Sequence, residues 1–126
     1  MEHNPVVWFE IHVQNMERAK AFYAAVFQCQ LERIKTDTEG MEMWSFPMLK
    51  ESTYGAPGAL VKMQGVSSGG NSVLVYFGCK DCAEEGARVR EQGGRIIKDK
   101  MSIGEYGFIV LAQDTEGNMI GLHSMQ

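Results

Sequence analysis

The sequence predicts an α+β fold in which one chain carries two tandem copies of a strand–helix–strand–strand–strand (βαβββ) unit. Three observations predict it. Strand-like segments flank two helical segments, the second half aligns on the first with a shift of 66 positions (Asn15 onto Asp81), and a polar, glycine-rich stretch separates the halves. A single unit would leave one face of its sheet uncovered, so we expect the two units to form curved mixed sheets around a shared cleft.

The first half begins with a strand and continues with a helix. Val6–Val13 is rich in β-branched and aromatic residues, which is typical of strands. Asn15 is a favourable N-cap, and apolar residues recur at helical spacing over Met16–Phe27. Three strand candidates follow, at Leu31–Lys35, Met41–Phe46 and Ala59–Met63.

The second half repeats this order. Ser72–Cys79 is strand-like, Asp81 takes the place of Asn15, and Cys82–Glu91 has helical spacing. The glycines at positions 93 and 94 end this helix, as glycine often does after a helix C-terminus. The remaining signals are strands at Arg95–Lys98, Gly107–Ala112 and Met119–Met125, with a turn at Asp114–Asn118.

The length bounds the organisation of the chain. With 126 residues, the chain can bury an apolar core without disulfides or a structural metal. We expect a single domain over residues 1–126, with module one at about 5–65, a linker at about 66–71 and module two at about 72–126.

The composition argues against several classes of partner. The net charge is −4 and the lysines and arginines are scattered, whereas nucleic-acid binding needs clustered cations, so we expect no nucleic-acid partner. No apolar run approaches the ~18 residues that cross a bilayer, so we expect no membrane partner. The first residues include an acid and a proline and do not resemble a signal peptide, which favours a cytoplasmic location.

Two of the three cysteines, Cys79 and Cys82, have the spacing of a CxxC motif. One interpretation is a redox pair in which a helix N-terminus stabilises a thiolate. The other is structural: Cys79 ends a buried strand and Cys82 begins a helix, with Asp81 near the N-cap. The odd number of cysteines argues against a disulfide framework, and both interpretations stay open.

Three stretches with a shared order and spacing carry a family resemblance over nearly the whole chain. They are Trp8–Val13 with Met16–Tyr23 and Val26-Phe27; Val75–Phe77 leading to Gly93–Ile97; and Gly107-Phe108 with Asp114–His123. Together they resemble the glyoxalase/bleomycin-resistance/extradiol dioxygenase (vicinal oxygen chelate, VOC) superfamily, in a poorly characterised glyoxalase-like branch. The resemblance implies the VOC fold, with its two βαβββ modules around a cleft.

The family's metal enzymes take a His from each first strand and a Glu from each last strand. Trp8 and Leu74 fall where the histidines belong, and Gly121 falls at the last Glu. The remaining Glu falls at Leu60 or Val61, depending on how the longer loop of the first half is gapped. None of these side chains can ligate a divalent ion. The resemblance therefore implies no metal and no other cofactor, and argues against glyoxalase I and dioxygenase chemistry.

Alternation along the strands places the polar candidates. Trp8, Glu10 and His12 share the face on which the family carries its ligand, and Tyr76 and His123 face the cleft by the same parity. Trp44 is a candidate cleft wall. Lys62 faces the cleft in only one of the two ways of aligning the longer loop of the first half with its counterpart in the second half. The predicted ligand-binding residues are Trp8, Glu10, His12, Trp44, Lys62, Tyr76 and His123.

Glu10 is the candidate catalytic residue. Desolvation could make it a general base, with His12 or His123 as the partner acid and Tyr76 as a donor to an oxyanion. The plainer interpretation is a hydrogen-bonded polar cluster among core tryptophans. Glu10, His12 and His123 are also an alternative metal set, although residues two apart on a strand are separated by roughly 6.5–7 Å, which is wide for one ion.

Three functions stay in play. The first is a bleomycin-resistance-like protein that binds a small organic ligand in an aromatic, partly polar cleft without the divalent metal. The alternative is a metal-independent lyase or isomerase acting on a small carbonyl or acid substrate, with Glu10 as base. The third is an accessory or regulatory module. The resemblance also implies a homodimer, because many relatives pair through these sheets.

Overall fold

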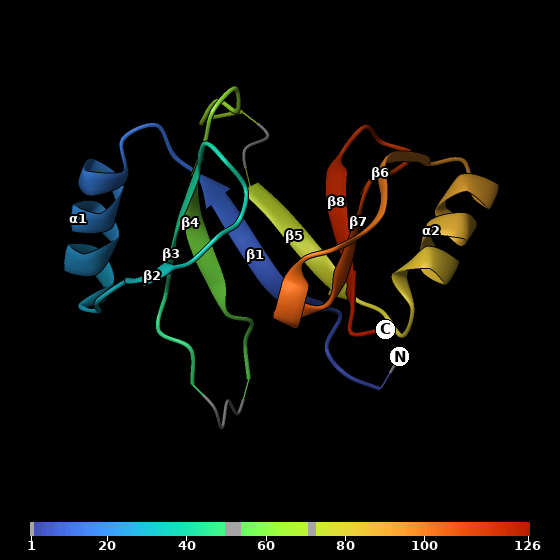
Figure 1. The fold of residues 1–126 in the computed structure, drawn as a ribbon, viewed down its shortest axis with the longest axis horizontal. Helices are drawn as coiled ribbons and strands as arrows, with labels where there is room; N and C mark the ends of the chain where they lie inside the picture. Colours follow the sequence, from blue (N-terminus) through green and yellow to red (C-terminus); the bar gives the residue numbers. More distant parts are fainter. Residues whose placement is uncertain (1, 50–53, 71–72) are drawn as a thin grey trace. The chain divides into compact units, whose positions relative to one another are not determined.

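The computed structural model describes residues 2–49, 54–70 and 73–126 (Figure 1). Two compact units are distinguished. We call Trp8–Val73 the first unit, and the N-terminal residues up to Val7 together with Leu74–Gln126 the second unit. The described residues give each half four strands and one α-helix in the order strand, helix, strand, strand, strand. The predicted α+β class is therefore confirmed. In the part of the chain that is described, no helix is long and apolar enough to cross a membrane.

The described residues of the first half form five elements. They are β1 (Val6–His12), α1 (Met16–Phe27), β2 (Glu32–Ile34), β3 (Met41–Ser45) and β4 (Gly58–Met63). The strands lie in the order β2-β3-β4-β1, with β1 parallel to β4 and the other neighbours antiparallel. The Asn15 side chain accepts a hydrogen bond from the backbone N–H of Arg18 (2.9 Å), which confirms the predicted N-cap. The helix ends at Gln28 in the left-handed conformation (φ 50°).

One face of this sheet packs against α1. The core consists of Val13, Met16 and Leu60, and partly buried side chains pack around it: Ile11, Ala19, Tyr23, Leu31, Trp44 and Phe46. In the sheet, Leu60 pairs with Ile11 on one side and with Trp44 on the other. Paired residues point to the same side of a sheet, so alternate residues of β1, β4 and β3 face the helix. We call the opposite side the helix-free face.

In the second half, six elements are seen over residues 73–126. They are β5 (Val73–Gly78), α2 (Cys82–Glu91), β6 (Arg95–Ser102), the 3-10 helix η1 (Gly104–Tyr106), β7 (Phe108–Gln113) and β8 (Met119–Ser124). The strands lie in the order β5-β8-β7-β6, with β5 parallel to β8 and the other pairs antiparallel. Asp81 caps α2 by accepting a hydrogen bond from the N–H of Ala83 (3.0 Å).

The core of the second unit lies between α2 and one face of its sheet. Cys82, Val110 and Leu122 form its buried centre. Gly86 lies on the buried face of α2, where a Cβ would meet Ile96 and Val110 at an ordinary contact distance of 3.7 Å. Each half thus has a sheet with one face against its own helix and one helix-free face.

The predicted elements are confirmed in number and order, with differences at their ends. Both helices have the predicted bounds. β6 extends to Ser102 and contains two register shifts, which an alternation pattern does not reveal. The predicted strand at Gly107 begins one residue later, because Gly107 has a positive φ (104°) that ends η1. The start of the predicted strand at Ser72 and the end of the predicted linker at Asn71 lie outside the described residues.

Candidate functional site

The helix-free face of the first unit carries the polar residues predicted on β1. Glu10 pairs with Ala59 and His12 with Val61 of β4, and these residues alternate with Ile11 and Leu60, which face the helix. Trp8 lies two residues before Glu10 and shares its face. The first unit therefore brings Trp8, Glu10 and His12 together, as the alternation predicted.

The Glu10 carboxylate is held by its neighbour on the same strand. The indole N–H of Trp8 donates a hydrogen bond of 3.1 Å to Glu10 Oε2. Glu10 is only 8% exposed, and a buried carboxylate is costly unless hydrogen bonds satisfy it. The Trp8 side chain therefore orients an acid that lies among the small apolar side chains of β4.

The helix-free face of the second unit carries Tyr76 on β5 and His123 on β8. Tyr76 pairs with Gly121, and a Cβ built at Gly121 would lie 2.5 Å from Cε1 and 2.8 Å from Cγ of the Tyr76 ring. The ring therefore lies over Gly121 and occupies the space that a side chain there would need. His123 Nε2 is 2.6 Å from the carbonyl oxygen of Tyr106, so this nitrogen carries the proton and donates.

The sheet register corrects one predicted position. Gly121 pairs with Tyr76, and the residue that aligns with Tyr76 in the first half is Glu10, whose partner on β4 is Ala59. The fourth family position is therefore Ala59, and the prediction of Leu60 or Val61 was wrong by one or two residues. The longer loop before β4 caused the error, because its extra residues can be gapped in several ways.

The family's divalent ion does not fit the residues present. Trp8, Ala59, Leu74 and Gly121 offer no ligand atom in their side chains, and the Tyr76 ring covers Gly121. Among the described residues, no three His, Cys, Asp or Glu side chains are grouped so that they could hold a metal. His123 belongs to the second unit, so the alternative set of Glu10, His12 and His123 stays a prediction.

Trp44 and Lys62 lie on the other side of the sheet from Glu10. Trp44 packs against the α1 core, its indole N–H donates to Glu42 Oε2 (2.8 Å), and Lys20 Nζ lies 3.3 Å from the ring centroid. Lys62 pairs with Glu42 and has the same parity as Leu60. The sequence could not decide this, because the gap in the preceding loop sets the parity of β4. A ligand-binding role for either residue stays a prediction.

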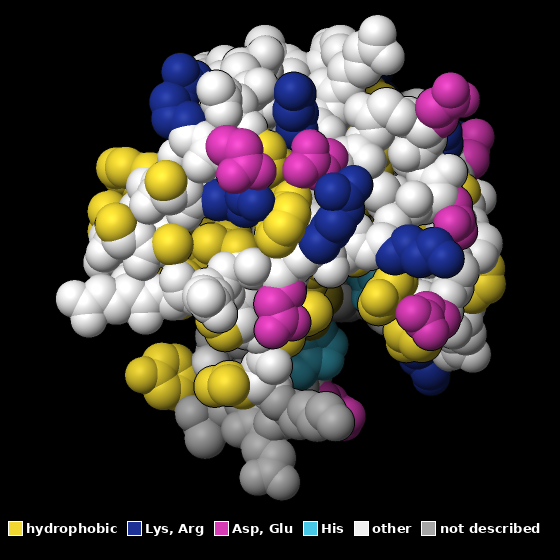
Figure 2. Space-filling model, turned by 60° about the vertical axis from the view of Figure 1, so that its left-hand side comes forward, with side chains coloured by type: hydrophobic (Ala, Val, Ile, Leu, Met, Phe, Trp, Pro, Cys, Tyr) yellow, Lys and Arg dark blue, Asp and Glu magenta, His cyan; other side chains and the backbone are white. Residues whose placement is uncertain are grey.

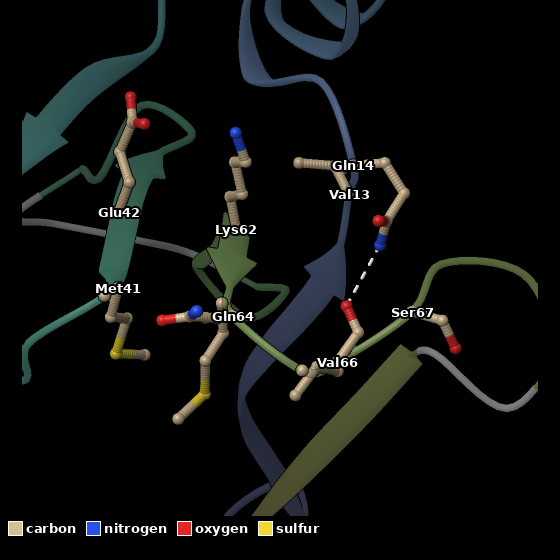
Figure 3. Close-up of a pocket in the computed structure, with 11 residues that line it drawn as sticks. Val13, Gln14, Met41, Glu42, Lys62, Gln64, Val66 and Ser67 are labelled. Atoms are coloured by element: carbon tan, nitrogen blue, oxygen red, sulfur yellow. Dashed lines mark hydrogen bonds between the residues drawn. The ribbon is translucent and has the colours of Figure 1, made fainter.

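A hollow of about 580 Å³ lies at the ends of β1 and β4 in the first unit (Figure 3). Figure 3 shows the side chains of Glu42 and Lys62 extending to the same side, while Met41 extends to the other. The Gln14 amide closes one end by donating to the carbonyl oxygen of Val66 (3.0 Å). The volume of this hollow is within the range of small-molecule sites. Of the predicted ligand residues, Lys62 lines this hollow, and Trp44 lines a smaller one of about 270 Å³ beside α1.

The CxxC segment is structural. Cys82 is the first residue of α2, it is fully buried, and its N–H donates to Ser124 Oγ (2.9 Å). Burial, followed by the negative charge of Glu85, raises the pKa of Cys79 from 9.0 to about 11. A redox pair requires a thiolate at neutral pH, and this thiol stays protonated there. The structural interpretation is therefore supported, and the redox interpretation is not.

Comparison with known proteins identifies the family. The model of the Glyoxalase/Bleomycin resistance protein/Dioxygenase superfamily matches residues 6–122. The chain therefore belongs to this superfamily, as the sequence motifs indicated. A comparison with curated proteins found no match.

Solved structures with a similar fold include two methylmalonyl-CoA epimerases and a hypothetical protein. Methylmalonyl-CoA epimerase from Mycobacterium tuberculosis is 17% identical, with a TM-score of 0.70 over 97% of this chain and 88% of that chain. A variant of the Streptomyces coelicolor methylmalonyl-CoA epimerase in complex with 2-nitronate-propionyl-CoA is 15% identical, with a TM-score of 0.68 over 96% of each chain. A hypothetical protein from Bacillus halodurans C-125 is 13% identical, with a TM-score of 0.73 over 96% of this chain and 94% of that chain. At these identities the similarity shows the fold alone.

Proposed function

We propose that this protein binds a small organic ligand on the helix-free faces, without the family's divalent metal. The observation that carries the proposal is the buried Glu10 carboxylate, which the Trp8 indole orients beside Ala59. A few placed polar groups on an otherwise apolar and aromatic surface are typical of small-molecule sites. On the helix-free face of the second unit, Tyr76 and His123 likewise supply aromatic rings that carry polar groups.

Metal independence is part of the proposal. All four family positions lack ligand atoms, so a divalent ion would have no protein ligand there. We expect elemental analysis of the purified protein to find no stoichiometric metal, and Zn²⁺, Ni²⁺ or Mn²⁺ to leave the Tm unchanged. A stoichiometric metal that raises the Tm and is lost on EDTA treatment would contradict this part.

The chain supplies a matched pair of variants for the binding test. Glu10 accepts the indole N–H of Trp8 on the helix-free face, and Glu42 accepts that of Trp44 on the helix side. A panel of small alcohols and amides, which can donate a hydrogen bond to a carboxylate, is screened by thermal shift and tryptophan fluorescence. Glu10→Gln should weaken binding of any hit about 10-fold or more, since a charge-assisted contact is lost, and Glu42→Gln should not. Equal effects of the two variants would place the ligand elsewhere.

A second candidate function is a metal-independent isomerase or lyase with Glu10 as general base. Two observations favour it: the carboxylate is buried and oriented, and two fold neighbours are named epimerases. In such a reaction Glu10 removes a proton from the carbon next to a carbonyl and returns it. Exchange of that proton in D₂O, followed by NMR with propionyl-CoA, tests the step. Exchange that persists in Glu10→Gln would eliminate Glu10 as the base.

A cytoplasmic location and a small-molecule partner without nucleic acid belong to the same proposal. The scattered cations and the net charge of −4 support the exclusion of nucleic acid. Cell fractionation and a filter-binding assay with duplex DNA test these two points.

A further inference from the structure

The hollow of about 580 Å³ at the ends of β1 and β4 has two chemically different rims. Figure 3 shows the side chains of Glu42 and Lys62 on one side of the strands and that of Met41 on the other. Met63 is paired with Met41, so it lies on the same side as Met41. We call Glu42 and Lys62 the charged rim, and Met41 and Met63 the thioether rim. The hollow therefore offers polar contacts on one side and apolar contacts on the other.

The charged rim presents one cation and one anion side by side. Glu42 and Lys62 are direct partners across β3 and β4, where Cβ atoms are about 4.5–5.5 Å apart. The indole N–H of Trp44 donates to Glu42 Oε2 (2.8 Å), which holds the carboxylate and leaves its second oxygen able to accept from a ligand. Lys62 is exposed, and its ammonium makes no ion pair within the described part of the chain. Both charges are therefore open to a ligand.

The βαβββ unit does not require this charged pair, as the second half shows. In the sheet register, Ser124 takes the place of Lys62, and its partner Phe108 takes the place of Glu42. Ser124 is buried, and its hydroxyl accepts the backbone N–H of Cys82 at the start of α2. The charged pair is thus a property of the first half. Figure 2 brings this side of the molecule forward and shows acidic and basic side chains next to one another among hydrophobic ones.

We propose that this hollow binds a free α-amino acid with an apolar side chain. Such a molecule carries its ammonium and its carboxylate on the same carbon, so the carboxylate can contact Lys62 while the ammonium contacts Glu42. A surface of mixed sign suits a zwitterion better than a ligand with a net charge. The apolar side chain packs against the thioether rim, because methionine side chains adapt to different shapes. The described residues that line the hollow do not include Trp8 or Glu10, so this site is separate from the proposed Glu10 site.

A series of matched ligands tests this chemistry. A chemical-shift titration by NMR with L-leucine should give a dissociation constant on the order of 1 mM, as expected for so small a ligand. Isocaproate, which lacks the ammonium, and isoamylamine, which lacks the carboxylate, should each bind at least about 10-fold more weakly. Glycine should bind about 10-fold more weakly because it buries less apolar surface. Leucine that does not bind at about 20 mM, or isocaproate and isoamylamine that bind as tightly as leucine, would overturn the proposal.

The spacing of the two charges supplies a sharper control. ε-Aminocaproate is an isomer of leucine whose ammonium and carboxylate lie at opposite ends of the chain. It has the same atoms and the same net charge, but it cannot present neighbouring charges to Lys62 and Glu42. We therefore expect it to bind about 10-fold more weakly than leucine. Equal affinity of the two isomers would exclude an α-amino acid as the ligand that the charged rim selects.

Variants of the charged rim test its two residues. Lys62→Met keeps the aliphatic stem and removes the ammonium, and Glu42→Gln keeps the shape and removes the negative charge. Each should weaken leucine binding about 10-fold, whereas Lys62→Arg should retain most of it. Lys98→Met is the control and should have no effect, because Lys98 is an exposed lysine on β6 outside the hollow. Circular dichroism checks that the variants fold. Unchanged leucine affinity in Lys62→Met would overturn the proposal and leave the pair as a contact between strands.

Trp44 reports the position of the ligand. Because its indole N–H donates to Glu42, an ammonium bound at that carboxylate should change the Trp44 emission. Trp44→Phe should abolish this change while the NMR titration still detects binding. An emission change that persists in Trp44→Phe would come from Trp8, the other tryptophan of the chain. It would place leucine at the proposed Glu10 site and overturn the assignment to the hollow.

Discussion

Adding one methyl group at Gly121 tests whether Tyr76 occupies the family's ligand position. Gly121→Ala introduces a Cβ that the present geometry places 2.5 Å from Cε1 and 2.8 Å from Cγ of the ring. Packed carbon atoms do not approach so closely, and Tyr76 is only 6% exposed, so the ring or the strand must move. Such overpacking costs about 1–3 kcal/mol. The entropy that alanine removes from the unfolded chain offsets about 0.4–1 kcal/mol of this.

The net expectation for Gly121→Ala is a loss of about 1 kcal/mol, which lowers the Tm by about 4 °C in a chain of this length. The assay is thermal and urea unfolding followed by circular dichroism. Gly86→Ala is the matched control, because its Cβ would meet neighbours at an ordinary 3.7 Å inside α2. That change should stabilise the protein by about 0.5–1 kcal/mol. The same chemical change should therefore have opposite signs at the two sites.

A Gly121→Ala variant as stable as the native protein would refute the reasoning, since the ring could not then lie over Gly121. Making Gly121→Ala in the Tyr76→Ala variant separates the effect of the ring from other causes of destabilisation. In Tyr76→Ala the obstruction is gone, so Gly121→Ala should no longer destabilise. A penalty that persists in this background would point to the backbone of β8 and not to the Tyr76 ring.

Three further predictions concern the two helices and their surroundings. Burial raises the pKa of Cys79 from 9.0 to about 11, so its contribution to stability is fully present below pH 9 and is lost as the pH rises toward 11. The free energy of unfolding, measured with urea, should fall as the pH rises from 9 toward 11, and Cys79→Ala should reduce this fall. The same pH dependence in the native protein and in Cys79→Ala would contradict the assignment. Asp81→Ala should lower the Tm more than Asp81→Asn, since asparagine keeps the cap and loses only the ion pair with Lys100 (2.8 Å); equal losses would deny the cap a role. Lys20→Met keeps the aliphatic stem over Trp44 but removes the ammonium, so we expect a loss of under about 1 kcal/mol and a shifted tryptophan emission; unchanged emission would exclude the contact.

The elements of the fold could be predicted from local sequence signals. Both helices have their predicted bounds because Asn15 and Asp81 are strong N-caps and the apolar spacing that follows is helical. The shared face of Trp8, Glu10 and His12 follows from alternation within one strand, so it needed no partner strand. The absence of ligand atoms at Trp8, Leu74 and Gly121 is likewise a matter of residue identity.

The tertiary structure decided what depends on pairing between distant segments. The register of β4 against β1 places Ala59 opposite Glu10 and sends Lys62 and Trp44 to the helix side. The sequence left this open, because the loop before β4 is longer than its counterpart before β8 and can be aligned in more than one way, and a shift of one residue reverses the face of every side chain. The Tyr76 ring over Gly121 is also a cross-strand contact, made by residues 45 positions apart in the sequence (121 − 76). Periodicity reports which residues share a strand face, and only hydrogen-bonded register reports which residues meet across strands.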